Sequence, residues 1–245
     1  MSERIRLDLA LEQRGLLPSR ARARDAILRG TVTINGAVAV KQNQMVGPTD
    51  KIEIDDPAAR YVSRSALKLV AGLDAGDIAV KERICLDVGS STGGFTQVLM
   101  ERGAAKIYAV DVGHDQLHQR LRGSNKVVSH EGVNAKDLTA EIIPDIIDVL
   151  VSDVSFVSVV KILAAPLALC KSGADAIILF KPQFEVGRRN IGKGGIVTDD
   201  QAIANALDEM ITFMDENDFA HRMSIASPIT GGDGNTETVA VFRRR

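Results

Sequence analysis

From residue 62 onward, short apolar runs alternate with longer amphipathic segments, and this alternation limits the folds that the chain can adopt. Apolar strands that alternate with helical patterns are typical of a largely parallel sheet covered by helices on both faces. We therefore predict an α/β fold built on a doubly wound sheet. Seven strands are expected, near residues 84–88, 106–111, 126–130, 146–152, 174–180, 220–226 and 237–242.

The end of this pattern differs from the rest. The last two predicted strands are joined by SPITGGDGNTE, residues 227–237, which is too short and too rich in glycine to form a crossover helix. We therefore expect these two strands to run antiparallel. Before them, Thr198 is the expected start of a long helix, with Gln201 completing a capping box.

The N-terminal region carries a different pattern and is predicted to form a small α+β unit. A first helix is expected over residues 5–14, and a second begins after Ser19 as its N-cap and ends at Gly30. Two apolar runs then flank Asn35-Gly36, the dipeptide that best accommodates the positive φ angles of a tight hairpin. These elements indicate two short helices packed with a small sheet.

The chain of 245 residues, 45% of them hydrophobic, can form one large domain and a small one. We predict a small domain over residues 1–56, a linker over 57–61 that begins at Pro57, and a large domain over 62–245. The net charge of −2 gives no overall attraction to nucleic acid. Residues 14–41, however, contain five arginines and one lysine against a single aspartate, so this part of the small domain is basic.

The two cysteines, Cys85 and Cys170, lie inside apolar runs, with no thiol or histidine near them in sequence. We interpret them as buried core residues of a protein in a reducing compartment. The N-terminus lacks the apolar centre of a signal peptide, and no window approaches the roughly 18 apolar residues needed to cross a bilayer. We therefore expect a cytoplasmic protein without membrane contact.

His114 and His118 are four residues apart on a predicted helix, which is the spacing of a two-histidine metal site. No third ligand accompanies them. An exposed helix face is the better interpretation, so no metal is expected.

The segment LDVGSSTGGFT, residues 86–96, begins as a strand and continues as small residues and glycine. In doubly wound sheets, the turn after the first strand lies where the backbone approaches a ligand. Asp87 precedes this turn, and Asp111 ends the next strand about twenty residues on, where such folds bind a ribose diol. The residues that keep the turn free of large side chains are Gly89, Ser91, Gly93 and Gly94.

These residues favour a nucleoside cofactor. The turn lacks both the dinucleotide fingerprint G-x-G-x-x-G and the G-K-[ST] of a triphosphate site, so NAD and ATP are poorly supported. S-adenosylmethionine has no phosphates and fits better. The alternative is that the glycines only make a tight connection between strand and helix.

Four charged residues are expected to meet at the same edge of the sheet. Asp153 and Lys181 each end a predicted parallel strand, and Glu237 begins the final antiparallel strand, so all three belong to one edge. Lys68 interrupts an apolar helix. Taken singly, each residue has an ordinary explanation as a strand-end, helix-surface or other surface charge. Together, two lysines beside two carboxylates can tune a lysine toward proton transfer.

The order Lys68, Asp153, Lys181, Glu237 resembles the Lys-Asp-Lys-Glu tetrad of FtsJ-type ribose 2′-O-methyltransferases. The motifs YVSRSALKL, LDVGSSTGGFT, VSDVSF, LFKPQFE and GNTE resemble the TlyA (hemolysin A) family of ribosomal RNA methyltransferases. The N-terminal unit resembles the small RNA-binding domain named after the fourth protein of the small ribosomal subunit. The resemblance covers nearly the whole chain, and its motifs occur in the same order.

The resemblance implies a Rossmann-like methyltransferase sheet and S-adenosylmethionine-dependent methylation of a ribose 2′-hydroxyl, with cytidines of ribosomal RNA or ribosomal subunits as substrate. Lys181 is the candidate base or oxyanion-stabilising group, tuned by the other three tetrad residues. Gly89, Gly93 and Phe95 would surround the methionine and ribose, and Asp111 would hold the ribose. Either Asn134 or Asp137 would lie near the adenine.

Contacts with RNA are expected from basic residues of two regions. On the second predicted helix, Arg20 and Arg24 should share a face, whereas Arg22 points elsewhere. The basic, glycine-rich segment 181–195 either is a surface loop or binds phosphates beside Lys181. The candidate RNA-binding residues are Arg4, Arg6, Arg20, Arg24, Lys41, Arg188, Arg189 and Lys193.

Three other functions are less well supported by the sequence. Base amino-methylation is the first, but DVSF, residues 153–156, lacks the prolines of the Asn-Pro-Pro-Tyr motif that such enzymes often carry. A membrane-active hemolysin is suggested only by the historical name of the family. An RNA-binding protein with a decayed enzyme domain is disfavoured by the complete tetrad.

Overall fold

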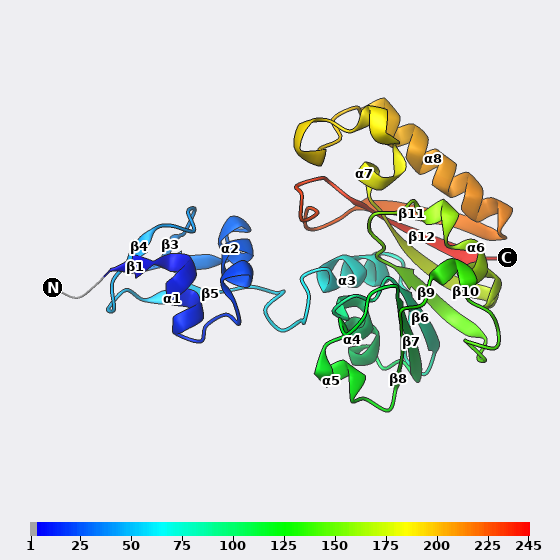
Figure 1. The fold of residues 1–245 in the computed structure, drawn as a ribbon, viewed down its shortest axis with the longest axis horizontal. Coiled ribbons are helices and arrows are strands. Elements are labelled where there is room, and N and C mark those ends of the chain that lie inside the picture. The colour runs from blue at the N-terminus through cyan, green and yellow to red at the C-terminus, as the bar shows by residue number, and fades with distance from the viewer. Residues whose placement is uncertain (1–3) are drawn as a thin grey trace. The chain divides into compact units, whose positions relative to one another are not determined.

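The structure is a computed structural model and describes residues 4–245 (Figure 1). The first three residues of the predicted small domain lie outside this range. The chain divides into two compact units, Met1–Arg60 and Tyr61–Arg245. Each unit is described by itself.

Over the described residues 4–60, the small unit contains two helices and two small sheets. The helices α1 and α2 carry the apolar side chains Leu7, Leu11 and Ile27, which are buried together with Val32 of the sheet. Strand β1 pairs antiparallel with β4, and a second sheet has the order β3-β2-β5. The element bounds are β1 Ile5–Arg6, α1 Leu7–Gln13, α2 Arg20–Leu28, β2 Val32–Ile34, β3 Ala37–Val38, β4 Met45–Val46 and β5 Ile52–Ile54.

The predicted second helix and hairpin are confirmed. The Ser19 side chain accepts a hydrogen bond from the Arg22 amide at the start of α2. Asn35 and Gly36 have φ angles of 51° and 84° between β2 and β3, which is the positive-φ turn that the dipeptide favours. The predicted first helix starts too early, because residues 5 and 6 pair with β4 and the helix begins only at residue 7.

The large unit is built on a sheet of seven strands in the order β11-β12-β10-β9-β6-β7-β8. Neighbouring strands are parallel except at β12, which is antiparallel to both β10 and β11. The predicted sheet and its antiparallel end are therefore confirmed. The bounds are β6 Ile84–Val88, β7 Lys106–Asp111, β8 Val127–Glu131, β9 Ile147–Ser152, β10 Cys170–Phe180, β11 Phe219–Ala226 and β12 Thr238–Arg244.

Helices cover both faces of this sheet (Figure 1). Leu69 of α3 and Leu99 of α4 are buried on one face, and Leu167 of α6 and Met210 of α8 are buried on the other. The helix bounds are α3 Ala66–Ala75, α4 Gly94–Glu101, α5 Gln119–Arg122, α6 Ala164–Ala168, α7 Pro182–Glu185 and α8 Asp200–Glu216.

The N-cap of α8 differs from the prediction. Asp199 holds this position, and its carboxylate accepts hydrogen bonds from the amides of Gln201 and Ala202. A carboxylate accepts hydrogen bonds from these amides and also complements the positive end of the helix dipole. Asp199 is therefore a better N-cap than the neighbouring Thr198.

Both cysteines are free and buried, as expected, and burial raises the pKa of each thiol to about 12. The predicted helix through His114 and His118 is wrong, because α5 begins only at Gln119. The His118 ring instead accepts a hydrogen bond from the Arg120 amide at the start of this helix. Within residues 4–245, no helix is long and apolar enough to cross a membrane.

Candidate active site

The strand register brings three of the four predicted tetrad residues to one edge of the sheet. Phe180, the last residue of β10, pairs with Thr238, the first residue of β12. Lys181 directly follows Phe180, and Glu237 directly precedes Thr238, so the two charged residues lie next to each other on neighbouring strands. Asp153 follows the end of β9, which pairs with β10, and its amide donates to the Val88 carbonyl of β6.

The fourth residue, Lys68, comes from α3 and forms a buried ion pair with Glu237. Gly72 lies one turn later on the same face of the helix. A Cβ atom on Gly72 would lie 2.8 Å from Val239 Cγ1 and 2.9 Å from Ile177 Cγ2. The missing side chain therefore lets α3 approach the sheet closely enough for Lys68 to reach the carboxylate.

The other lysine is also held by short contacts. Lys181 Nζ lies 2.7 Å from the Asp153 carboxylate and donates a hydrogen bond of 2.7 Å to Ser155 Oγ. Burial raises the pKa of Glu237, and Asp153 adds to the rise, whereas Lys68 and Lys181 oppose it. All four charged groups are thus close enough to influence one another, and the structure brings together the complete predicted tetrad.

A cavity of about 550 Å³ opens beside this tetrad at the carboxyl ends of the strands. It is lined by Gly89 and Ser91 of the glycine turn, by Asp111, Asn134 and Asp153, and by the apolar side chains of Val133, Val154 and Ile162. A smaller hollow of about 140 Å³ shares several of these residues and extends the site toward Ser63, Phe95 and Lys181.

Asp111 connects the strand end to the glycine turn. Its carboxylate accepts hydrogen bonds from the amides of Ser91, at 2.8 Å, and Gly113, at 2.7 Å. Of the two adenine candidates, Asn134 lines the larger cavity, whereas Asp137 is exposed in the short helix η1 (Ala135–Asp137) and is not part of the lining.

The glycines of the turn have different structural roles. Gly89 lines the cavity, and a Cβ on it would lie 2.9 Å from Val154 Cγ1. A Cβ on Gly93 would lie 2.3 Å from Leu121 Cδ1. Both glycines have positive φ angles, 83° and 96°. The sequence suggested that the bare turn leaves room for a ligand, but at Gly93 the room is taken by the side chains that follow β7.

Gly94 has a similar packing role. Its Cβ would lie 2.5 Å from Ser65 Oγ and 2.9 Å from Ser63 Cβ. The start of α4 therefore packs directly against the segment that leads into α3. Phe95, the next residue, is buried and lines the smaller hollow.

Asp87 is fully buried beneath the turn. The Thr96 hydroxyl donates a 2.6 Å hydrogen bond to its Oδ2, while its Oδ1 has no hydrogen-bond partner among the described residues. Burial raises the pKa of Asp87 to about 7, and the nearby carboxylates Asp153 and Asp111 add to this rise.

Phe156 lines the larger cavity but is not among the residues predicted for the site. Its side chain is 91% exposed, and its φ angle of 69° is unusual for a bulky residue. The ring lies 5.3 Å from that of Phe184, measured between centroids. Its position directly after Asp153-Val154-Ser155 was the sequence feature that could have predicted its place at the cavity.

The basic segment after Lys181 is anchored to the start of β12. Asn235 is buried, accepts a 2.9 Å hydrogen bond from the Val197 amide and donates one of 2.9 Å to the Gly195 carbonyl. Gln183 donates to Asp233 in the same connection. The predicted RNA-binding residues Arg188, Arg189 and Lys193 are exposed on the short helices η3 (Arg188–Asn190) and η4 (Lys193–Gly195).

In the small unit, three of the predicted RNA-binding residues contact one carboxylate. The guanidinium groups of Arg6, Arg20 and Arg24 all donate to Asp8. Arg22 instead donates to the Ala58 carbonyl, so the prediction that Arg20 and Arg24 share a face is confirmed. The other two candidates lie apart from this contact: Arg4 donates to the Met45 carbonyl, and Lys41 is exposed.

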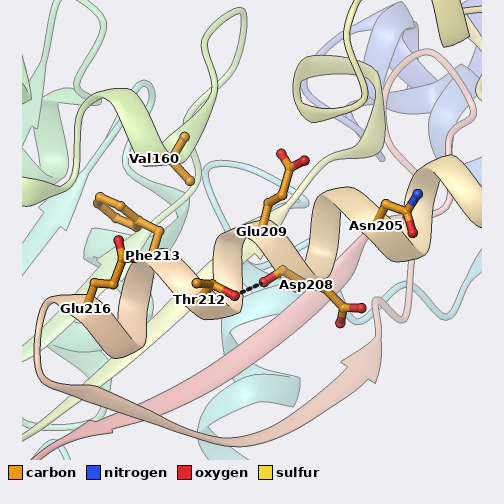
Figure 2. A pocket seen from close by; sticks show the side chains of 7 residues that line it. All are labelled: Val160, Asn205, Asp208, Glu209, Thr212, Phe213 and Glu216. Atoms are coloured by element: carbon orange, nitrogen blue, oxygen red, sulfur yellow. Dashed lines mark hydrogen bonds between the residues drawn. The ribbon is translucent and has the colours of Figure 1, made fainter.

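Another hollow, of about 540 Å³, is lined by residues of α8 and by Val160 and contains none of the candidate residues (Figure 2). Asp208, Glu209 and Glu216 line it together with Val160 and Phe213. Its carboxylates would repel a phosphate backbone. Among residues 4–245, no group of three His, Cys, Asp or Glu side chains could hold a metal ion.

The residues of the larger cavity fit a nucleoside that lacks phosphates. Asp111 offers a carboxylate to a ribose diol, and apolar side chains supply walls for a base. Of the residues that the structure describes, no lysine or arginine lines this cavity. The unpartnered Oδ1 of Asp87 adds a buried acceptor beneath the turn.

The sheet order and this site define a methyltransferase of the S-adenosylmethionine-dependent class. A model of the FtsJ-like methyltransferase family matches residues 61–244, and a model of the S4 domain matches residues 5–52. The chain belongs to the TlyA (hemolysin A) family of FtsJ-like methyltransferases, with an N-terminal S4 domain.

Two relatives document the match over nearly the whole chain. Hemolysin A of Brachyspira hyodysenteriae is 41% identical over 239 residues, which is 97% of this chain and 99% of the relative. The 16S/23S rRNA (cytidine-2′-O)-methyltransferase TlyA of Mycobacterium tuberculosis is 43% identical over 239 residues, which is 97% of this chain and 89% of the relative.

Solved structures show the same fold. A hemolysin structure from Streptococcus thermophilus superimposes with a TM-score of 0.76 at 33% identity and covers 100% of this chain and 90% of that one. Magnesium protoporphyrin IX methyltransferase from Synechocystis, solved with bound S-adenosylhomocysteine, shares the fold at 13% identity with a TM-score of 0.52 and covers 74% of this chain and 83% of that one.

Proposed function

We propose that this protein methylates the ribose 2′-hydroxyl of a cytidine in ribosomal RNA. The observation that carries the proposal is the meeting of Lys68, Asp153, Lys181 and Glu237 beside a cavity that suits a nucleoside. The name of the M. tuberculosis relative supports the same substrate and atom. The S4 domain supports an RNA substrate.

S-adenosylmethionine would supply the methyl group as an electrophile. Asp111 would accept hydrogen bonds from its ribose, Gly89 would allow close approach at the turn, and Asn134 would lie near its base. Asp137 is less suited to this last role because it is exposed outside the cavity lining.

Lys181 is proposed to act on the 2′-hydroxyl. Its Nζ either accepts the hydroxyl proton or stabilises the negative charge that develops on the oxygen as the proton leaves. Asp153 and Ser155 fix the position of Nζ, and the Lys68–Glu237 pair completes the charge network. Direct displacement needs no covalent intermediate on the protein, so positioning and proton removal are the tasks of these side chains.

The target strand would be held by basic side chains in both units. Arg188, Arg189 and Lys193 follow Lys181 in a segment anchored by Asn235, and Arg6, Arg20 and Arg24 form a basic cluster in the S4 domain. The exposed Phe156 ring at the cavity offers a stacking surface for an unpaired base. The proposed substrate locates the reaction in the cytoplasm.

The test compares 2′-O-methyl positions in ribosomal RNA from cells that make this protein and from cells that lack it. We expect the loss of at least one 2′-O-methylcytidine, with all base methylations unchanged. Identical maps, or the loss of a base methyl group, would contradict the proposal and favour a different substrate or base methylation.

A further inference from the structure

Asp8 contacts three arginines of the S4 domain. It lies in the first turn of α1, its side chain is 0% exposed, and its carboxylate accepts hydrogen bonds from Arg6, Arg20 and Arg24. The distances are 2.9 and 3.1 Å from Arg6, 3.1 Å from Arg20 and 3.3 Å from Arg24. A single buried carboxylate thus joins the strand β1 and the helix α2 through their charged side chains.

The three guanidinium groups remain available to a ligand. Their side chains are 42%, 42% and 47% exposed, although Asp8 itself is buried. Each guanidinium carries five N–H donors, and Asp8 takes only two from Arg6 and one each from Arg20 and Arg24. Three positive charges also exceed one negative charge, so the cluster still attracts anions.

Fixed guanidinium groups bind phosphate better than mobile ones. An exposed arginine that moves freely loses side-chain entropy when it contacts a phosphate, and a restrained arginine loses less. The guanidinium fork also needs a defined orientation to donate two parallel hydrogen bonds to phosphate oxygens.

We propose that Asp8 is a positioning residue for RNA binding, and that it holds Arg6, Arg20 and Arg24 as one preorganised phosphate-binding cluster. This inference rests on the proposed function, because it takes an RNA backbone as the ligand. The hydrogen bonds from the three arginines outweigh burial and lower the pKa of Asp8 to about 2, so the carboxylate is charged at any pH used for RNA binding.

For Asp8→Asn, the positioning role and simple electrostatics predict opposite changes in RNA affinity. Asp8→Asn removes a negative charge from an RNA-binding surface, and charge alone would strengthen binding. If Asp8 positions the arginines, the same change weakens binding. We expect the Kd for a ribosomal RNA fragment to rise about three- to tenfold, since charge-assisted phosphate contacts become less well formed.

The measurement uses the full-length protein, with binding at several salt concentrations. Glu53→Gln is the matched control, because Glu53 is an exposed acid of the same domain whose partner is Lys51. We expect this control to leave affinity unchanged or raise it slightly. We also expect Asp8→Asn to raise the KM for RNA while kcat and cofactor affinity stay at parent values. Unchanged or tighter RNA binding by a folded Asp8→Asn variant would overturn the proposal.

A second variant covers the case in which Asp8→Asn does not fold. Replacing Arg6, Arg20 and Arg24 with lysine keeps every charge but removes the forked donors. We expect this variant to bind RNA several-fold more weakly than the parent with a similar salt dependence. Equal affinity would overturn the positioning role.

A third variant separates this inference from the proposed function. Arg20→Gln with Arg24→Gln should weaken RNA binding and flatten its salt dependence, because fewer counterions are released. No effect of this double variant would mean that Arg20 and Arg24 do not bind RNA, which would overturn this inference but leave the proposed methylation untouched. Weakening by the double variant with no effect of Asp8→Asn would contradict only the positioning role.

Discussion

Lys68 and Glu237 lie 169 residues apart in the chain and form a buried ion pair at the carboxyl edge of the sheet. Their side chains are 7% and 2% exposed. Burial of two charges is costly unless each is paired, so loss of one partner leaves the other in an unfavourable environment.

Glu237→Gln should therefore lower both stability and turnover. We expect the free energy of unfolding to fall by about 3 kcal/mol, because the Lys68 ammonium stays buried without its carboxylate. Glu141→Gln, at an exposed position, is the control. Combining Glu237→Gln with Lys68→Met should recover stability but not methyl transfer. Full activity in that double variant would show that the pair is structural only.

Gly72 should be intolerant of any side chain. A Cβ at this position would lie within 3 Å of both Val239 and Ile177, so Gly72→Ala must displace α3 from the sheet and separate Lys68 from Glu237. We expect a loss of about 1–3 kcal/mol in unfolding free energy, despite the better helix propensity of alanine, and a large fall in kcat. Gly123→Ala, where the nearest atom is 3.5 Å away, is the control. Parent-like kcat in Gly72→Ala would mean that the approach of this helix does not matter for catalysis.

Asp87 should make stability depend on pH. Its pKa in the folded protein is about 7, above the ordinary value of 3.8, so its contribution to stability is complete below pH 4 and is lost as the pH rises toward 7. The loss attributable to Asp87 should amount to a few kcal/mol at most. Unfolding measured from pH 4 to 8 should show a steeper decline for the parent than for Asp87→Asn. Parallel curves would show that Asp87 ionises normally.

Asn235 should hold the basic segment in place without touching the cofactor. Asn235→Ala removes two hydrogen bonds and leaves the Val197 amide buried without its acceptor. We expect faster trypsin cleavage after Arg188 or Arg189, a higher KM for RNA and unchanged cofactor affinity. Asn217→Ala, which removes one hydrogen bond at the end of α8, should not affect cleavage in this segment. Equal cleavage rates in parent and Asn235→Ala would remove Asn235 from this role.

The sheet and the meeting of Asp153, Lys181 and Glu237 could be predicted because both depend on periodic apolar patterns and on strand polarity. Lys68 lies on a helix, and the resemblance to the FtsJ-type tetrad grouped it with the other three. Asp153 and Lys181 end apolar runs, and parallel strands end at one edge, so their proximity follows without knowledge of packing. The positive φ angles at Asn35 and Gly36 also follow from local chemistry alone.

Other features depend on contacts between distant segments and could not be predicted. Gly93 is bare because Leu117 and Leu121 occupy the adjacent space, and Gly72 is bare because of two strands that are remote in sequence. We therefore expect Gly93→Val to destabilise the fold as well as to weaken cofactor binding, because its side chain would collide with Leu117 and Leu121. Two of the arginines that contact Asp8, Arg20 and Arg24, lie 12 and 16 residues further along the chain, so this cluster could not be predicted either.

Lys181 is proposed to act at the ribose 2′-hydroxyl of ribosomal RNA without carrying the methyl group itself. The most direct test uses purified protein, ribosomal RNA and a cofactor with a labelled methyl group, followed by nuclease digestion and mass spectrometry. The parent should label the 2′-oxygen of cytidine. Lys181→Ala should lose labelling by about 10²- to 10⁴-fold while cofactor and RNA affinities remain at parent values. Lys181→Arg keeps the positive charge, so residual labelling would assign charge stabilisation to Lys181, whereas complete loss would assign proton removal. Label on a base, or near-parent labelling by Lys181→Ala, would contradict the claim.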